Sequence, residues 1–252
     1  MREREDKVVW PATPVRLISG TGKQGSGMRR ILLVFTLVLT PAMIVLSAPL
    51  PARAQQKVQI GDKEAILHVP PNPRASAVLV PGKGNIIPSD PLLRNQAALN
   101  AKGIATLTVP HDTRLGQAIE YMRSIKAPVA LIGVSAGVSY AARGVGRGAK
   151  PDTLVLISGS LMPPGKLPPA QELLKTPTVL PPTLVMANRN DACEFTPASA
   201  AEPFVAWAGG RATLQWIGGS GSGRDPCGPN SAHGFMGADA EVVNGIAAFV
   251  IR

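Results

Sequence analysis

The G-x-S-x-G motif at residues 133–137 places Ser135 between two glycines. An apolar run typical of a buried strand, 128–132, precedes the motif, and small residues that can begin a helix, 138–145, follow it. Such a tight turn holds its serine in a strained backbone conformation, and the glycines let strand and helix approach without a Cβ clash. We therefore predict that Ser135 Oγ is exposed at the carboxyl edge of a sheet, where a nucleophile could act.

A serine hydroxyl becomes an effective nucleophile when a histidine accepts its proton and a carboxylate orients that histidine. A G-x-S-x-G turn between strand and helix is typical of α/β-hydrolases, in which the acid and then the histidine follow the serine along the chain. Asp191 follows a predicted strand at 183–187, and His233 follows another at 212–217. We therefore expect Ser135, Asp191 and His233 to form a catalytic triad.

Two further histidines and two further acids are the alternatives. His68 lies near the first predicted strands, where a surface or packing role is expected. His111 follows a later strand, where it would line the substrate site or form a turn. Asp225 shares the loop of His233, and Asp239 is expected to serve the start of the last helix. None of the four fits the expected chain order of a triad as well.

Acyl transfer also requires hydrogen-bond donors for the oxyanion that forms on the substrate. One expected donor is the backbone N–H of Ala136, directly after the serine. The second is expected in the loop after a predicted strand at 76–80, where Gly82 and Lys83 are the candidates. This loop begins with Pro81, whereas many α/β-hydrolases carry a histidine before the glycine, and the choice between the two donors stays open.

Strands and helices alternate from residue 57 to residue 252. Strands are expected at 57–68 (one strand or a hairpin), 76–80, 104–109, 129–134, 153–157, 183–187 and 212–217, and helices at 91–102, 115–125, 138–145, 198–208 and 238–251. This alternation predicts an α/β fold, a mostly parallel sheet with helices on both faces. The proline-rich segment 161–182 is expected to be a short cap over the site or a surface connection, with at most one short helix.

The first 54 residues resemble a bacterial secretory signal peptide with an N-terminal extension. A basic segment at 28–30 precedes an apolar segment at 31–46, and an Ala-x-Ala cleavage signal stands at 52–54. A transmembrane anchor is the alternative, but the apolar run is short for a membrane span. We expect cleavage before Gln55, which gives a periplasmic or secreted protein with no stable membrane anchor.

Residues 55–252 suit one hydrolase domain with a sizeable core. The whole chain has 26 Lys and Arg and 16 Asp and Glu, a net charge of +10. Eight of these basic and three of these acidic residues lie in the first 54, so the domain carries +5. The domain contains no dense basic run, which argues against binding to nucleic acid.

The chain has two cysteines, Cys193 and Cys227. In an exported protein such a pair is a candidate disulfide, and two unrelated thiols are the alternative. A metal site is disfavoured because the chain offers neither a C-x-x-C motif nor a histidine cluster beside these cysteines.

Together these motifs resemble small exported serine hydrolases of the bacterial α/β-hydrolase superfamily, over residues 57–252. Exported members with a similar C-terminal half pair an Asp-x-Cys with an Asp-Pro-Cys that precedes the histidine, as at 191–193 and 225–227 here. The resemblance implies hydrolysis of a small-molecule carboxylic ester through an acyl-enzyme, with no metal or organic cofactor. A peptidase or amidase with the same triad, and a catalytically silent binding domain on this fold, are the alternatives.

Overall fold

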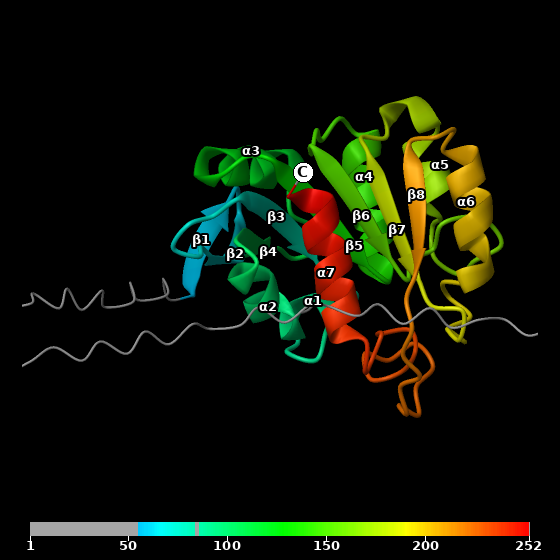
Figure 1. Cartoon of the computed structure of the whole chain (residues 1–252). Coiled ribbons are helices and arrows are strands. Elements are labelled where there is room, and N and C mark those ends of the chain that lie inside the picture. The colour runs from blue at the N-terminus through cyan, green and yellow to red at the C-terminus, as the bar shows by residue number, and fades with distance from the viewer. Residues whose placement is uncertain (1–54, 84–85, 252) are drawn as a thin grey trace, which may run out of the picture. The chain divides into compact units, whose positions relative to one another are not determined.

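The computed structural model describes residues 55–83 and 86–251 (Figure 1). The predicted signal peptide, 28–54, lies outside these residues. No helix in the described part of the chain is long and apolar enough to cross a membrane.

Eight strands form one sheet in the order β1-β2-β4-β3-β5-β6-β7-β8. The strands are β1 (Gln56–Ile60), β2 (Lys63–His68), β3 (Ala75–Val80), β4 (Ile104–Thr108), β5 (Val129–Val134), β6 (Thr153–Ile157), β7 (Thr183–Ala187) and β8 (Ala212–Trp216). The β1–β2 hairpin is antiparallel and β2 pairs antiparallel with β4, whereas β3 to β8 are parallel to one another. The mostly parallel sheet predicted from the sequence is therefore confirmed.

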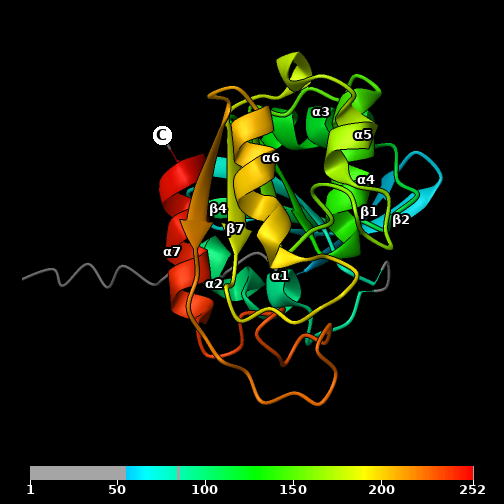
Figure 2. The same cartoon turned by 90° about the vertical axis from the view of Figure 1, so that its right-hand side faces the viewer.

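Helices cover both faces of this sheet. They are α1 (Pro91–Arg94), α2 (Gln96–Ala101), α3 (Leu115–Ile125), α4 (Ala136–Gly146), α5 (Ala170–Leu174), α6 (Ala201–Trp207) and α7 (Asp239–Val250). α1, α2 and α7 pack on one face, and α3, α4, α5 and α6 on the other (Figures 1 and 2). Each face buries its own apolar cluster, which explains why the central strands β3, β4 and β5 are buried along their whole length.

The predicted helix at 91–102 is interrupted in the structure. It forms two short helices, α1 and α2, which meet at Asn95. The Asn95 amide donates to Pro91 O at 3.0 Å and to Asp239 Oδ1 at 2.6 Å, so a contact with α7 holds the break. The cap of α1 is Asp90, whose carboxylate accepts the N–H of Leu92 at 2.9 Å.

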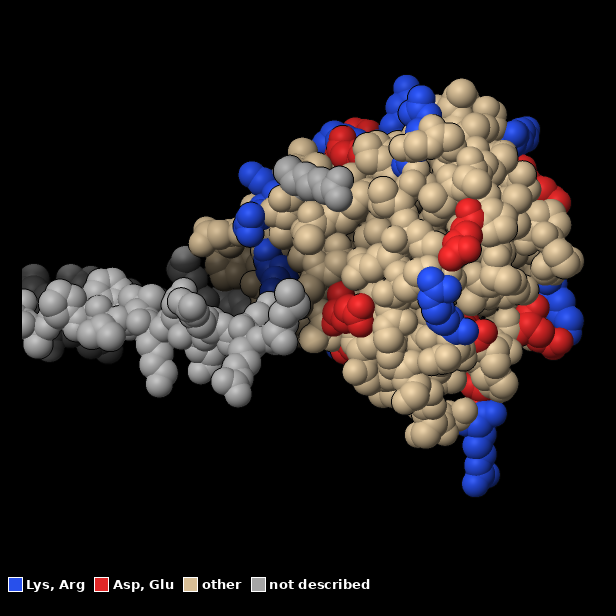
Figure 3. Space-filling model, turned by 45° about the vertical axis from the view of Figure 1, so that its right-hand side comes forward, with Lys and Arg blue, Asp and Glu red and all other residues tan. Residues whose placement is uncertain are grey.

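The proline-rich segment 161–182 contains one α-helix, α5, and a single 3₁₀ turn at Pro177–Val179. α5 packs along α4, where the backbone of Leu173 lies against Gly146 (Figure 2). On the face seen in Figure 3, basic and acidic side chains are scattered among uncharged surface and form no continuous basic stripe.

The turn between β5 and α4 has the strain that the motif predicts. Ser135 has φ 54° and ψ −121°, in the left-handed half of backbone space that side chains other than glycine rarely adopt. A Cβ built on Gly133 would lie 2.6 Å from Gly137 O, and one built on Gly137 would fall on Val80 O. The turn therefore forms only when both positions lack a side chain.

Replacing Gly137 with alanine tests this packing. Because the backbone of β3 would have to move, we expect Gly137→Ala to lower the free energy of unfolding by about 1–3 kcal/mol. Denaturant unfolding measures the change. Gly116→Ala in α3 is the matched control, because no atom lies within 4 Å of its added Cβ. Equal unfolding midpoints for the two variants would contradict the steric argument.

Candidate active site

Ser135 stands at the carboxyl edge of the sheet, between β5 and α4. Its backbone N–H donates to Ile157 O at 2.8 Å, which fixes the turn against β6. The serine lines a small cavity of about 40 Å³ together with Gly82, Asp90, Cys227 and His233. No residue of 161–182 lines this cavity, so the position of the proline-rich segment fits a surface connection better than a cap.

Asp191 and His233 lie in contact, as the chain order predicts. His233 Nδ1 is 2.8 Å from Asp191 Oδ2, and the two side chains are 3% and 1% exposed. An ionised carboxylate only accepts hydrogen bonds, so Nδ1 carries the proton and the other ring nitrogen of the neutral imidazole is an acceptor. That atom, Nε2, is buried and has no hydrogen-bond partner among the described residues. The pair can therefore accept a proton from a group that enters the cavity.

Several polar contacts hold the loop of His233. The His233 N–H donates to Ser231 Oγ at 3.2 Å, and the Asn188 amide donates to Ala232 O at 3.2 Å. Arg94, in α1, donates to the carbonyl groups of Pro229 and Gly234. The histidine is thus fixed from β7 on one side and from α1 on the other.

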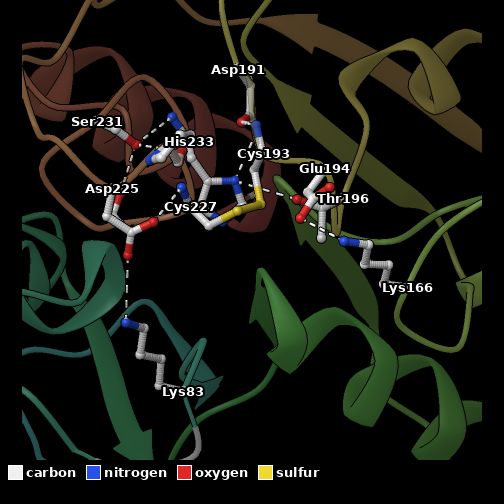
Figure 4. Close-up of a disulfide and its surroundings, with 12 residues drawn as sticks. Lys83, Lys166, Asp191, Cys193, Glu194, Thr196, Asp225, Cys227, Ser231 and His233 are labelled. Carbon is white, nitrogen blue, oxygen red and sulfur yellow. Dashed lines mark hydrogen bonds and ion pairs between the residues drawn. A yellow bond between two sulfur atoms is a disulfide. The ribbon is translucent and has the colours of Figure 1, made fainter.

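The two competing acids make other contacts. Asp225 accepts the N–H of Cys227 at 3.0 Å, and its carboxylate lies 3.9 Å from Lys83 Nζ (Figure 4). Asp239 accepts from Arg94 Nε at 2.7 Å and from the Asn95 amide at 2.6 Å. Asp191 alone among these three acids contacts a histidine in the described structure.

The two other histidines lie away from the Ser135 cavity. His111 Nε2 is 2.6 Å from Pro81 O, so His111 fastens the start of the loop that follows β3. His68, at the end of β2, is half-buried, and burial lowers the pKa of its imidazole. Neither occupies the position of the base.

The loop after β3 is anchored by a buried carboxylate. The Gly82 N–H donates to Asp90 Oδ2 at 2.8 Å, and Asp90 is 3% exposed. Burial raises the pKa of Asp90, although the N–H groups of Gly82 and Leu92 oppose that shift. A Cβ on Gly82 would lie 3.1 Å from the Cβ of Ser135, so this loop passes directly beside the serine.

Two backbone donors remain free beside Ser135. Among the described residues, neither the N–H of Ala136 nor that of Lys83 has a hydrogen-bond acceptor. The Gly82 N–H is already bonded to Asp90. Asp90 also caps α1. Its hydrogen bond with Gly82 depends on the path of the loop between the two residues, which no sequence pattern predicts.

Cys193 and Cys227 form the predicted disulfide, with an S–S distance of 2.03 Å and a Cα–Cα distance of 4.7 Å (Figure 4). The Cys193 N–H also donates to Asp191 Oδ1 at 2.9 Å, and Cys227 lines the Ser135 cavity. The disulfide therefore joins the loops that carry Asp191 and His233. Within the described ranges, no three His, Cys, Asp or Glu side chains gather as metal ligands would.

No protein-family model matches this chain, and no curated protein matches its sequence. Solved structures do match. An esterase domain from Rhodothermus marinus superposes with a TM-score of 0.60 at 15% identity, over 79% of this chain and 99% of that one. A dienelactone hydrolase from Anabaena variabilis superposes with a TM-score of 0.55 at 15% identity, over 78% of this chain and 95% of that one. A carboxylesterase from Lactobacillus plantarum superposes with a TM-score of 0.55 at 14% identity, over 77% of this chain and 94% of that one. The sheet order, the strained turn at Ser135 and the structural neighbours agree that the chain has the α/β-hydrolase fold.

Proposed function

We propose that this chain is a serine hydrolase of carboxylic esters, in which Ser135 is the nucleophile, His233 the base and Asp191 the acid. The observation that carries the proposal is the buried His233–Asp191 pair. Nε2 of His233 has no hydrogen-bond partner among the described residues, and His233 lines the same cavity as Ser135. The strained turn at Ser135 supports it independently. The matched esterases and hydrolases support hydrolysis on this fold.

The reaction would proceed in two steps. Ser135 Oγ attacks the ester carbonyl while His233 Nε2 takes the hydroxyl proton, and Asp191 stabilises the imidazolium that forms. The proton then passes to the departing alcohol, which leaves Ser135 acylated. Water attacks the acyl-enzyme with His233 again as base, and the acid product and free serine result. The small cavity, about 40 Å³, favours short acyl groups.

We propose the N–H groups of Ala136 and Lys83 as the oxyanion donors, because neither has an acceptor among the described residues, Ala136 follows Ser135 directly and Lys83 follows Gly82, which lies beside Ser135. Of the two candidates in the loop after β3, Lys83 is preferred because the Gly82 N–H is bonded to Asp90. Asp90 is then a positioning residue. Its carboxylate fixes the peptide group between Pro81 and Gly82, and the next peptide group carries the Lys83 N–H.

The disulfide supports two parts of the proposal. It holds the Asp191 loop to the His233 loop, which is rich in glycine over residues 218–223. It also favours export, because disulfides form and persist in oxidising compartments. We therefore retain a periplasmic or secreted location and a small-molecule ester substrate as part of the proposal.

Ser135→Ala tests the nucleophile. We expect it to lower kcat for p-nitrophenyl acetate about 10⁶-fold and to abolish labelling by a fluorophosphonate. Ser139→Ala is the matched control, because Ser139 lies one turn further along α4 and its hydroxyl donates to Pro168 O at 2.7 Å. That variant should keep both activity and labelling.

The same assay separates the alternatives. Faster cleavage of aminoacyl p-nitroanilides than of esters would indicate a peptidase or amidase. A wild-type protein that is neither labelled nor active would indicate a binding domain. Wild-type turnover by Ser135→Ala would overturn the assignment of the nucleophile.

Asp90→Asn tests the anchoring of the oxyanion loop. The two N–H groups of Gly82 and Leu92 bond to different oxygens of Asp90, and the substitution replaces one of these oxygens with an NH2 donor, so one of the two bonds is lost. We expect kcat to fall about 10- to 100-fold with KM nearly unchanged, because the loop is displaced rather than the binding cavity. Asp152→Asn is the control, since Asp152 accepts the Val129 N–H at 2.7 Å at the opposite edge of the sheet. Equal kcat values for the two variants would contradict the positioning role.

Removal of the disulfide, by reduction or in the Cys193→Ser/Cys227→Ser variant, tests its role. Because the two cysteines are 34 positions apart in the sequence, chain entropy predicts a loss of stability of about 4 kcal/mol. We also expect a lower kcat at temperatures where the protein is still folded. A reductant should not affect the double variant further. Two free thiols in unreduced, denatured protein would disprove the bond, and an unchanged kcat would disprove its positioning role.

A further inference from the structure

A second cavity, of about 530 Å³, lies between the start of α3 and α4. None of its lining residues also lines the cavity of Ser135. Its volume is in the range that holds a small organic molecule. The proposed ester hydrolysis gives this cavity no role.

Three arginines line the cavity: Arg114 just before α3, Arg143 in α4, and Arg147 at the C-cap of α4. Arg143 and Arg147 are four residues apart, so they lie on the same side of the end of the helix. In the described structure, Arg94 and Arg123 form ion pairs with acids, whereas none of these three has an Asp or Glu within ion-pair distance. Their guanidinium groups are therefore available to a ligand.

The lining includes one carboxylate, that of Asp112. It forms an ion pair with Lys63, and this lysine lowers the pKa of Asp112. The negative charge of Asp112 is thus balanced by a lysine outside the lining. The charge of the three arginines remains uncompensated, and the cavity is suited to an anion.

Aromatic rings form another part of the wall. The rings of Tyr140 and His111 stack with centroids 3.9 Å apart, and the Arg143 guanidinium carbon lies 5.5 Å from the Tyr140 centroid. Such a distance is within the range of a cation–π contact, which restrains the arginine. The bond from His111 to Pro81 O fixes the other ring. The wall of the cavity thus places a charged group, Arg143, next to planar rings, those of Tyr140 and His111.

We propose that this cavity binds a small organic oxyanion, a molecule with a phosphate or carboxylate group on a planar body. Guanidinium groups bind both kinds of oxyanion through paired N–H donors, and the planar body would lie against the stacked pair of His111 and Tyr140. This binding is independent of the proposed function, because the site shares no lining residue with the Ser135 cavity.

Isothermal titration calorimetry at low salt tests the proposal with phenyl phosphate, benzoate and inorganic phosphate. We expect one-to-one, saturable binding of phenyl phosphate or benzoate, and the stronger of the two identifies the preferred oxyanion. Inorganic phosphate should bind more weakly because it lacks the ring. Saturable binding of none of the three would overturn the proposal.

Variants locate the binding. Arg143→Gln should raise the Kd at least about tenfold, as expected for loss of a charged hydrogen-bond donor. Arg74→Gln is the control, because Arg74 precedes β3 and does not line the cavity. Ser135→Ala should leave the Kd unchanged. Equal weakening by Arg74→Gln, or loss of binding in Ser135→Ala, would place the anion elsewhere and refute the site.

Two further measurements guard against a folding defect. Thermal unfolding should be the same for Arg143→Gln and the wild type. Should it differ, Arg147→Gln replaces that variant, because Arg147 is exposed and makes no ion pair in the described structure. Arg143→Lys keeps the charge but loses the paired donors, so it should bind more weakly than the wild type. Wild-type Kd values in both Arg143→Gln and Arg147→Gln would contradict the proposal.

Discussion

The constraint on which the site depends is the close contact between the start of α4 and the end of β3. A side chain at Gly137 would collide with Val80 O and would lie 2.8 Å from Pro81 O. The missing side chain lets the turn at Ser135 and the loop after β3 touch. Ser135 consequently stands beside Gly82, and Lys83, one of the two proposed oxyanion donors, follows Gly82 directly. Backbone sterics, rather than any attractive contact, thus bring the serine and its proposed donors together.

Asp191 and His233 are positioned in a different way. Both lie in loops beyond the ends of strands, where no ladder of backbone hydrogen bonds fixes them. Hydrogen bonds from side chains hold these loops instead. The Asn188 amide lies within 3.2 Å of three carbonyl oxygens, those of Gly218, Gly219 and Ala232. Arg94, in α1, donates to Pro229 O in the loop of His233. The disulfide joins Cys227, in the same loop, to Cys193. Ser135 is therefore held by packing, whereas Asp191 and His233 are held by cross-links between loops.

This difference explains how far the sequence predicts the structure. β5 and α3 have the bounds expected. A continuous apolar run predicts a buried strand, and apolar residues at helical spacing predict a helix, from the residues of the segment alone. The three proposed triad residues can be identified because strand order fixes where each loop emerges. The break at Asn95 cannot be predicted, because it depends on Asp239, 144 residues away. The choice between Gly82 and Lys83 likewise depends on the fold of one loop around Asp90.

Asp90 illustrates why a buried carboxylate can stand beside the proposed oxyanion site. Since burial raises its pKa, the neutral form stabilises the folded protein at acid pH, and that contribution is lost as the pH rises through the raised pKa. The ionised group therefore costs stability at higher pH, and its charge would oppose an oxyanion nearby. It accepts from Gly82 and Leu92, and Arg94 attracts its charge. One ionised group thus fixes the loop and the start of α1 together, which a neutral amide with a single oxygen cannot do. We infer that a rigid loop after β3 benefits the proposed reaction more than the ionised Asp90 costs in folding stability. Such a loss of stability is expected where a site needs preorganised hydrogen-bond donors.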